Sequence, residues 1–295
     1  TVTGAYVNDQ MHRRAFQKDY MYNATFPSQQ SQLNERFEGW HRATFDALLN
    51  YDKQFGDHGL KALAGWHTEK YSFYRNDMER KNFPNNDLDD MNAGDASTQK
   101  NEGYRRELAM ISWFGRVNYD YAGKYLLEAN IRADASSRFA TGNQWGFFPG
   151  ASVGWVMSDE SFMQNIKPID NLKWRISYGQ TGNNAIGLYD AYGKYSTNAK
   201  YDGVAGIIPS TMPNLGLTWE VSTQLDAGFD LSMFNNRLNI SADYFDKRTD
   251  NLLFSKELPN TSGFDNVQTN IGKVKFYGFD IEISSTNIET KDFIW

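Results

Sequence analysis

Residues 224–245 read QLDAGFDLSMFNNRLNISADYF, and this stretch decides the fold. Apolar side chains occupy every second position before the Asn235-Asn236 pair and again after it, while mostly polar residues and glycine fill the positions between. Alternation with period two is typical of a β-strand with one apolar face and one polar face. Two such strands around a short asparagine-rich turn predict an antiparallel hairpin.

The same alternation recurs along most of the chain, and segments with helical periodicity are nearly missing. It is clearest in residues 109–121, 125–134 and 172–178. Residues 158–166 alone predict a small helical turn, with Ser158 as its N-cap. The sequence therefore predicts an all-β protein.

Short and long connections alternate between the expected strands. Gly, Asn and Asp accept the positive φ angles of tight turns and mark the short connections. These short turns are residues 55–59, 122–123 and 234–237. Long polar loops are expected at about residues 74–104, 181–216 and 255–268. All the short connections therefore lie at one end of an up-and-down antiparallel sheet.

Strand length separates the possible all-β folds. Residues 218–233 keep the alternation for about sixteen residues, against about 5 to 6 in a common strand. At about 3.4 Å per residue such a strand spans on the order of 50 Å, more than a β-sandwich uses. The tilted strands of an outer-membrane barrel use such length, with the apolar face against lipid and the polar face toward water. The pattern predicts an antiparallel up-and-down transmembrane β-barrel.

This fold gives neighbouring residues opposite roles. We expect these side chains to face lipid: Leu127, Ile131, Leu225, Phe229 and Leu231. We expect these polar side chains to face the lumen: Glu128, Arg132, Asp134, Asp226 and Asp230. Tyr119, Tyr121 and Tyr125 flank a short turn, where an interfacial aromatic belt would lie.

Composition excludes several other classes of protein. The formal charge of -6, with no cluster of Lys and Arg, argues against a nucleic-acid surface. No run approaches the roughly 20 apolar residues of a membrane-spanning helix. The absence of cysteine removes disulfides, metal–thiolate sites and thiol catalysis. An aromatic content of 15% with a mean hydropathy of -0.65 is unusual for a packed soluble core and leaves a barrel open.

Several long blocks resemble one protein family, in family order and with family-like spacing. They are ATFDALLNYDKQFGDHGLKALAGW (43–66), GRVNYDYAGKYLLEANIRADASSRF (115–139), WGFFPGASVGWVMSDESFM (145–163), LKWRISYGQTGNNAIGLY (172–189), LTWEVSTQLDAGFDLSMFNNRLNISADYFDKRTDNLL (217–253) and NIGKVKFYGFDIEI (270–283). The chain resembles the SusC/RagA family of TonB-dependent outer-membrane transporters of Bacteroidetes. The first 36 residues and the long loops carry little of this pattern.

The resemblance implies a 22-stranded barrel in the bacterial outer membrane, an N-terminal plug that opens under force from TonB, and a SusD-like surface lipoprotein that helps capture glycans or peptides. Residues 1–295 are then expected to form a segment of a single barrel domain, with about nine to ten strands of the C-terminal part of the barrel. The plug, the TonB box and the closing strand are expected outside this segment. Residues 293–295 are expected to begin a further strand.

No enzymatic, metal or cofactor site is expected. Asp87, Asp89 and Asp90 do not fit the EF-hand spacing and are interpreted as a solvated loop. Asp226 and Asp230 share a strand face, as many polar pairs in a barrel do, and we do not interpret them as a glycosidase acid–base pair. The four histidines show no zinc-binding spacing, and GQTGNNAIG (179–187) lacks a phosphate-binding glycine pattern.

Aromatic residues in or beside the long loops are the candidate ligand contacts, because sugar rings stack on aromatic faces. These residues are Trp145, Tyr189, Tyr192, Tyr195 and Tyr201. Packing of the loops, or contact with a lipoprotein partner, is the alternative role for each.

The sequence as a whole predicts part of a transporter that imports a bulky nutrient, either a glycan or an oligopeptide, without covalent chemistry. The alternative is a soluble β-rich carbohydrate-binding or surface adhesion protein, and a passive porin is a third reading. No motif chooses between the two nutrient classes.

Overall fold

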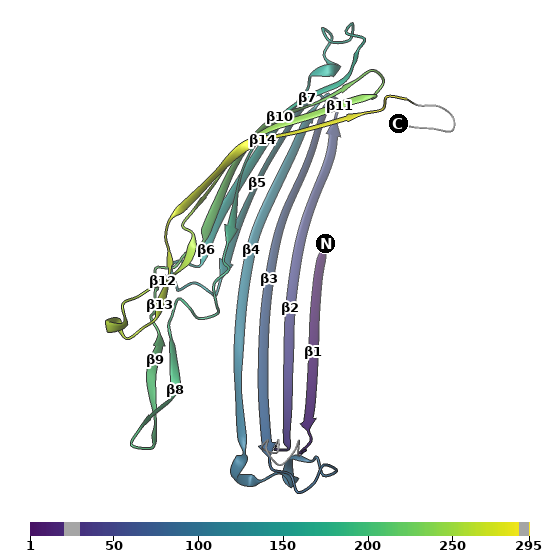
Figure 1. Ribbon diagram of the computed structural model, residues 1–295. Helices are drawn as coiled ribbons and strands as arrows, with labels where there is room; N and C mark the ends of the chain where they lie inside the picture. The colour runs from purple at the N-terminus through teal and green to yellow at the C-terminus, as the bar shows by residue number, and fades with distance from the viewer. Residues whose placement is uncertain (21–29, 289–294) are drawn as a thin grey trace. The chain divides into compact units, whose positions relative to one another are not determined.

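The computed structural model describes residues 1–20, 30–288 and 295, and it shows an all-β protein. Ten long strands form one sheet in the order β1-β2-β3-β4-β5-β6-β7-β10-β11-β14 (Figure 1). Their bounds are Val2–Gln17, Gln32–Phe55, His58–Lys81, Lys100–Tyr121, Tyr125–Ser136, Trp145–Val156, Ile169–Asn183, Glu220–Met233, Leu238–Asp250 and Lys273–Ser285. From β4 onward, strands that follow one another in the sheet are antiparallel neighbours, as expected. Residues 293 and 294, where a further strand was expected to begin, lie outside the described residues.

The three predicted short turns are confirmed, and their backbone angles explain their residues. Gly56 and Gly123 have φ of 59° and 69°, and Ala122 has a φ of 52°. Three successive residues of the turn between β10 and β11, residues 234–236, also have positive φ. Glycine and asparagine tolerate this left-handed region best, so these turns are strongly marked in the sequence.

The long connections were predicted in the right places but with the wrong extent. The loop expected at residues 74–104 is only residues 82–99, because β3 continues to Lys81 and β4 begins at Lys100. The other two long connections contain small hairpins of their own, which were not predicted. These are β8 Lys194–Tyr201 with β9 Val204–Thr211, and β12 Leu253–Glu257 with β13 Asn266–Asn270.

Only short 3-10 helices interrupt the strands. They are η1 Met91–Ala93, η2 Ala96–Thr98, η3 Met157–Asp159 and η4 Asn260–Ser262. The helical turn expected at residues 158–166 is therefore the single 3-10 turn η3, followed by hydrogen-bonded turns. Its N-cap position is Val156 with no side-chain cap, so the assignment of Ser158 as the cap was wrong. Among the described residues, none of the helices has the length and apolar character needed to span a membrane.

The chain divides into two compact units. Unit 1 consists of Thr1–Val2, Asp46–His67 and Met110–Trp295, and unit 2 of Thr3–Phe45 and Thr68–Ala109. Strands β1, β2, β3 and β4 contribute residues to both units, β1 only through Val2 in unit 1.

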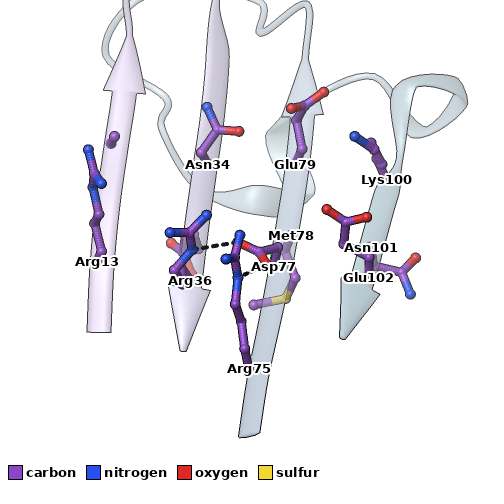
Figure 2. A pocket seen from close by; sticks show the side chains of 12 residues that line it. Arg13, Asn34, Arg36, Arg75, Asp77, Met78, Glu79, Lys100, Asn101 and Glu102 are labelled. Atoms are coloured by element: carbon purple, nitrogen blue, oxygen red, sulfur yellow. Dashed lines mark hydrogen bonds and ion pairs between the residues drawn. The ribbon is translucent and has the colours of Figure 1, made fainter. Parts of the chain in front are cut away.

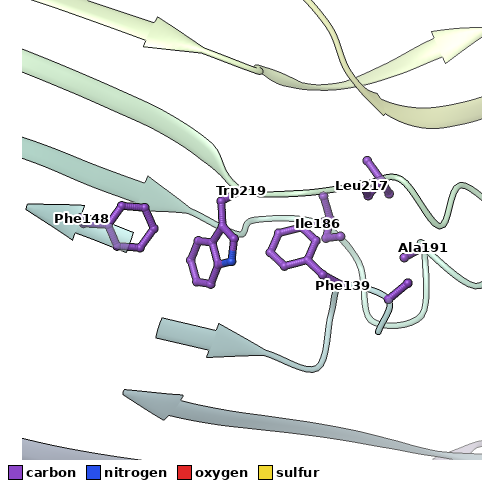
Figure 3. Packing of buried hydrophobic residues seen from close by; sticks show 7 residues of the cluster. Phe139, Phe148, Ile186, Ala191, Leu217 and Trp219 are labelled. Atoms are coloured by element: carbon purple, nitrogen blue, oxygen red, sulfur yellow. The ribbon is translucent and has the colours of Figure 1, made fainter. Parts of the chain in front are cut away.

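A small buried apolar core lies in unit 1, where the ends of strands meet the long connections (Figure 3). Trp219, just before β10, is its centre: the rings of Phe139 and Phe148 each lie 5.4 Å from the indole ring. The connection between β7 and β10 adds Ile186, Ala191 and Leu217 to the cluster, and Ala140 follows Phe139 in it. The indole nitrogen of Trp219 donates to the carbonyl of Gln144 at 2.9 Å, so its one polar group is satisfied. This cluster fastens the long connection to the strand ends.

Candidate functional site

The sheet of unit 1 has one apolar face and one polar face, as predicted. Its register places apolar residues opposite apolar residues across neighbouring strands: Phe229 lies opposite Trp174 and Ala242, and Leu231 lies opposite Leu172 and Ile240. The rings of Trp174 and Phe229 contact each other at 5.3 Å. The apolar face is not covered by any second layer of the described chain.

The five residues expected to face lipid share this apolar face. Ile131 is 54% exposed, Leu127 is 48% exposed and Leu225 is 44% exposed, while Phe229 and Leu231 are half-buried by their neighbours on the sheet. Exposed apolar patches on monomers in water are rarely larger than a few hundred Å². A continuous exposed apolar sheet face therefore indicates a surface that water does not cover.

The polar face of unit 1 carries a connected cluster of charges around Arg175 on β7. Its guanidinium lies 2.9 Å from Asp230 on β10 and 2.9 Å from Asp243 on β11. Ser241 accepts a hydrogen bond from Arg175 and donates one to Asp230 at 3.0 Å. Arg175 and Asp243 were not singled out from the sequence, because their partnership depends on the register of three strands.

Gly228 makes room for this cluster. It lies opposite Asp243 in the register of β10 and β11. A Cβ at position 228 would collide with Oδ1 of Asp243 and would come within 2.6 Å of the backbone carbonyl of Ala242. Because Gly228 has no side chain, the carboxylate of Asp243 can occupy this space and contact Arg175.

The other predicted lumen residues lie on the same polar face. Asp226 accepts hydrogen bonds from Ser177 at 3.2 Å and from Gln224 at 2.8 Å. Arg132 and Asp134 on β5 pair at 2.8 Å, and Glu128 lies on the same side of that strand. Because Asp226 and Asp230 each have their own partners, the structure does not join them as an acid–base pair.

The tyrosines at the short turn between β4 and β5 form a ring cluster. The rings of Tyr121 and Tyr125 stack at 6.2 Å, and His58 lies 4.8 Å from Tyr121 and hydrogen-bonds to the hydroxyl of Tyr119 at 2.7 Å. Tyr125 also donates to Glu160 at 2.6 Å. These residues have the amphipathic character of an interfacial belt.

Glu160 in the β6–β7 connection gives a pH-dependence that can be measured. Hydrogen bonds from Tyr125 and then Trp155 lower the pKa of Glu160 below its ordinary value of 4.5. A carboxylate with a lowered folded-state pKa stabilises the fold above that ordinary value and loses this contribution as pH falls through the folded-state pKa. We expect the full-length protein to lose more stability between pH 7 and pH 3.5 than its Glu160→Gln variant in urea-unfolding measurements. Equal losses would contradict the assignment.

The loop aromatics predicted as ligand contacts do not form one group. Trp145 begins β6 opposite Ala135, on the same face as Phe147, which lies opposite Ala133. Tyr192 donates to the carbonyl of Phe139 at 3.4 Å and so packs beside the buried core. Tyr195 and Tyr201 lie on β8, and Tyr189, with a φ of 69°, lies in the connection before it. The five residues are thus divided between a sheet face, a loop and a small hairpin.

The acidic loop of unit 2 is held by ion pairs. Arg14 lies 2.8 Å from Asp89 and 3.1 Å from Glu35, and it also donates to the backbone carbonyl of Asp89. The hydrogen bond from Arg14 lowers the pKa of Asp89. No group of three or more potential metal-binding side chains is found in residues 1–20, 30–288 and 295.

Unit 2 also contains a polar pocket of about 340 Å³ on the face of β1 to β4 (Figure 2). Its charged side chains come from all four strands and include both signs: Arg13, Arg36, Arg75, Asp77, Glu79, Lys100 and Glu102. This pocket was not predicted from the sequence, because its residues lie in segments with little apolar alternation. The end of β3 and the start of β4 were expected to belong to the loop at residues 74–104.

Comparison with known proteins identifies the family. The model of the family described as TonB dependent receptor-like, beta-barrel, matches residues 2–295. The chain belongs to this family of TonB-dependent receptor β-barrels. Members of the family are outer-membrane proteins, and the bacterial outer membrane is therefore the location of this chain. The family is one of transporters and not of enzymes, and it does not favour the soluble adhesion alternative.

Relatives and solved structures agree with this assignment. The chain is 38% identical over 251 residues to TonB-dependent receptor P3 of Formosa agariphila, covering 84% of this chain and 25% of that protein. It is 30% identical over 263 residues to TonB-dependent receptor SusC of Bacteroides thetaiotaomicron, covering 86% of this chain and 26% of that protein. The chain thus spans about a quarter of the length of these relatives.

The structure of the RagAB peptide transporter matches the fold closely. The TM-score is 0.88 at 26% identity, covering 98% of this chain and 32% of that chain. The resemblance to the SusC/RagA family, drawn from the sequence blocks, is confirmed. The transmembrane barrel predicted from alternation, and its partial extent implied by the resemblance, are confirmed as well.

Proposed function

We propose that this chain forms part of the wall of a TonB-dependent transporter that imports a bulky nutrient, a glycan or an oligopeptide, across the outer membrane. The observation that supports the proposal best is the contrast between the two faces of the unit 1 sheet. Ile131 and Leu225 project from an exposed apolar face, whereas Arg175 and its carboxylates form a hydrated face on the other side. Lipid on one side and a water-filled path on the other would satisfy both faces.

The proposal gives specific roles to the predicted residues. Leu127, Ile131, Leu225, Phe229 and Leu231 face lipid, and Glu128, Arg132, Asp134, Asp226 and Asp230 line the aqueous path. Trp145 shares its strand face with Phe147, so lipid contact suits it better than ligand contact. Tyr195 and Tyr201, which are 70% and 87% exposed, are the better candidates for contact with a nutrient or a lipoprotein.

We infer the partners of the full-length protein from the related proteins. TonB-dependent receptors are named for their dependence on TonB, and RagAB and SusC are the matched proteins. We propose that both units belong to one 22-stranded barrel domain, that a plug in another part of the full-length protein closes it, and that a SusD-like lipoprotein covers it.

The test uses the full-length protein in its own host. Deleting the gene should abolish uptake of at least one labelled nutrient from a panel of oligopeptides and oligosaccharides, and loss of TonB should have the same effect. The full-length protein should sediment with outer membranes and require detergent for extraction. Recovery in the soluble fraction, or unchanged uptake of every nutrient after deletion, would refute the proposal. Uptake that persists without TonB would instead indicate a passive pore.

A further inference from the structure

A self-contained group of four charges lies at the polar pocket of unit 2, and three of the four, Arg36, Arg75 and Asp77, line it. Arg36 lies 2.7 Å from Asp77, and Arg75 lies 2.5 Å from the same carboxylate. Both guanidinium groups also lie 3.8 Å from Glu38. Two positive and two negative charges thus neutralise one another at the centre of the sheet face.

Two further charges of opposite sign, Arg13 and Glu102, flank this group without an ion pair, and the exposed Lys100, which also lines the pocket, likewise forms none in the described part of the chain. Arg13 on β1 and Glu102 on β4 both line the pocket, and both are exposed. Figure 2 shows Arg13 and Glu102 on the outer two of the four strands, with the Arg36–Asp77 pair between them.

The separation between Arg13 and Glu102 is close to the end-to-end length of a short extended peptide. Strands β1 to β4 are consecutive neighbours, and three spacings of about 4.8 Å separate the backbones of β1 and β4 by about 14 Å. An extended peptide covers about 3.3–3.6 Å per residue, so its ends are about 14 Å apart when it has about four residues. The lengths of the Arg13 and Glu102 side chains widen this range to about three to five residues.

We propose that this pocket binds both ends of a short peptide, with its carboxylate on Arg13 and its ammonium group on Glu102. The inference rests on the proposed import function and selects oligopeptides over neutral glycans. A bound neutral glycan would displace water from Arg13 and Glu102 and would not provide a group of opposite charge for either. Removing water from a charged group without such a partner is costly. A peptide with free ends returns a charge-assisted hydrogen bond to each. The amide group of Asn34, two residues from Arg36 on the same face of β2, can bond the peptide backbone between the two ends.

Aromatic rings beside the pocket can receive side chains of the peptide. The rings of Trp40 and Phe73 lie 5.5 Å apart, and those of Phe73 and Tyr104 lie 5.7 Å apart, across β2, β3 and β4. Within each strand, the ring residue and the charged residue are an even number of positions apart, so the two side chains lie on the same face of the sheet. The pairs are Trp40 with Arg36, Phe73 with Asp77, and Tyr104 with Glu102. The pocket therefore favours a peptide with at least one apolar or aromatic side chain.

Calorimetric titration of the purified full-length transporter in detergent tests the proposal. The probe is Ala-Phe-Ala-Ala with free ends, compared with its N-acetylated form, its C-amidated form, an octapeptide and maltotetraose. Capping either end is expected to weaken binding about tenfold or more, since a hydrogen bond to a charged group is lost. The octapeptide and maltotetraose should also bind more weakly.

Matched variants separate this site from a solvated charged surface. In Arg13→Gln the C-terminal amide should no longer matter, while the N-terminal cap still should; in Glu102→Gln the reverse is expected. Arg105→Gln, three residues from Glu102 on β4 and therefore on the opposite face of that strand, serves as the control and should behave as the wild type. Equal affinities for capped and free peptides, tighter binding of maltotetraose, or no peptide binding would each overturn the proposal. TonB-dependent uptake of another nutrient would still support the import function in that case.

Discussion

Replacing Trp219 by alanine is expected to destabilise the region that joins β7 and β10 by about 3–5 kcal/mol, the usual cost of truncating a buried aromatic side chain. Trp219 is only 5% exposed and contacts both Phe139 and Phe148. The variant also leaves the carbonyl of Gln144 without its indole donor. Loss of the ring thus removes both the apolar packing and the hydrogen bond that hold the connection.

Limited proteolysis and urea unfolding of the full-length protein in vesicles measure this effect. Cleavage within residues 184–217 should become much faster in Trp219→Ala, and the unfolding midpoint of this region should fall. Trp219→Phe keeps most of the ring volume and should show a smaller change. Tyr201→Ala, at an 87% exposed position, is the control and should leave both readouts unchanged. Equal behaviour of Trp219→Ala and Tyr201→Ala would contradict the role of the cluster.

A strand with one apolar face and one polar face is well predicted from its sequence, because the alternation marks both the strand and its two faces. In β10 the apolar residues Leu225 and Phe229 alternate with Asp226 and Asp230, so both the strand and the face on which each residue lies could be predicted. The same contrast between the two faces underlies the prediction of a barrel, whereas the short turns were predicted from the Gly, Asn and Asp residues that accept positive φ angles.

Strands with polar residues on both faces were not predicted in full. Residues 75–77 of β3 read Arg-Asn-Asp, and β1 mixes polar and apolar side chains without regular alternation. Backbone pairing holds such segments in the sheet, and period-two patterning does not report backbone pairing. This is why the connection at residues 74–104 was predicted too long and β1 was not recognised.

The candidate site was predictable at the level of faces but not of contacts. Asp230 could be assigned to the polar face from parity alone, whereas its ion pair with Arg175 depends on the register between β7 and β10. Gly228 shows the same limit: a glycine inside a strand suggests a close approach, but only the paired strand reveals Asp243 as its neighbour.

Substituting Ile131 by arginine provides the most direct test that lipid covers the apolar face, and we expect it to destabilise the full-length protein by about 2–4 kcal/mol if the residue lies near the bilayer midplane. Ile131 is 54% exposed and lies opposite Gly115 and Pro149, so the new side chain meets no steric barrier on the sheet. The cost then comes from placing a guanidinium in hydrocarbon. Asn130→Arg, one residue away on the opposite face, should cost far less because water reaches that side. Urea unfolding from lipid vesicles compares the two variants directly. A similar small cost for both would mean that water reaches both faces of β5, and the proposed orientation of the whole sheet would have to be abandoned.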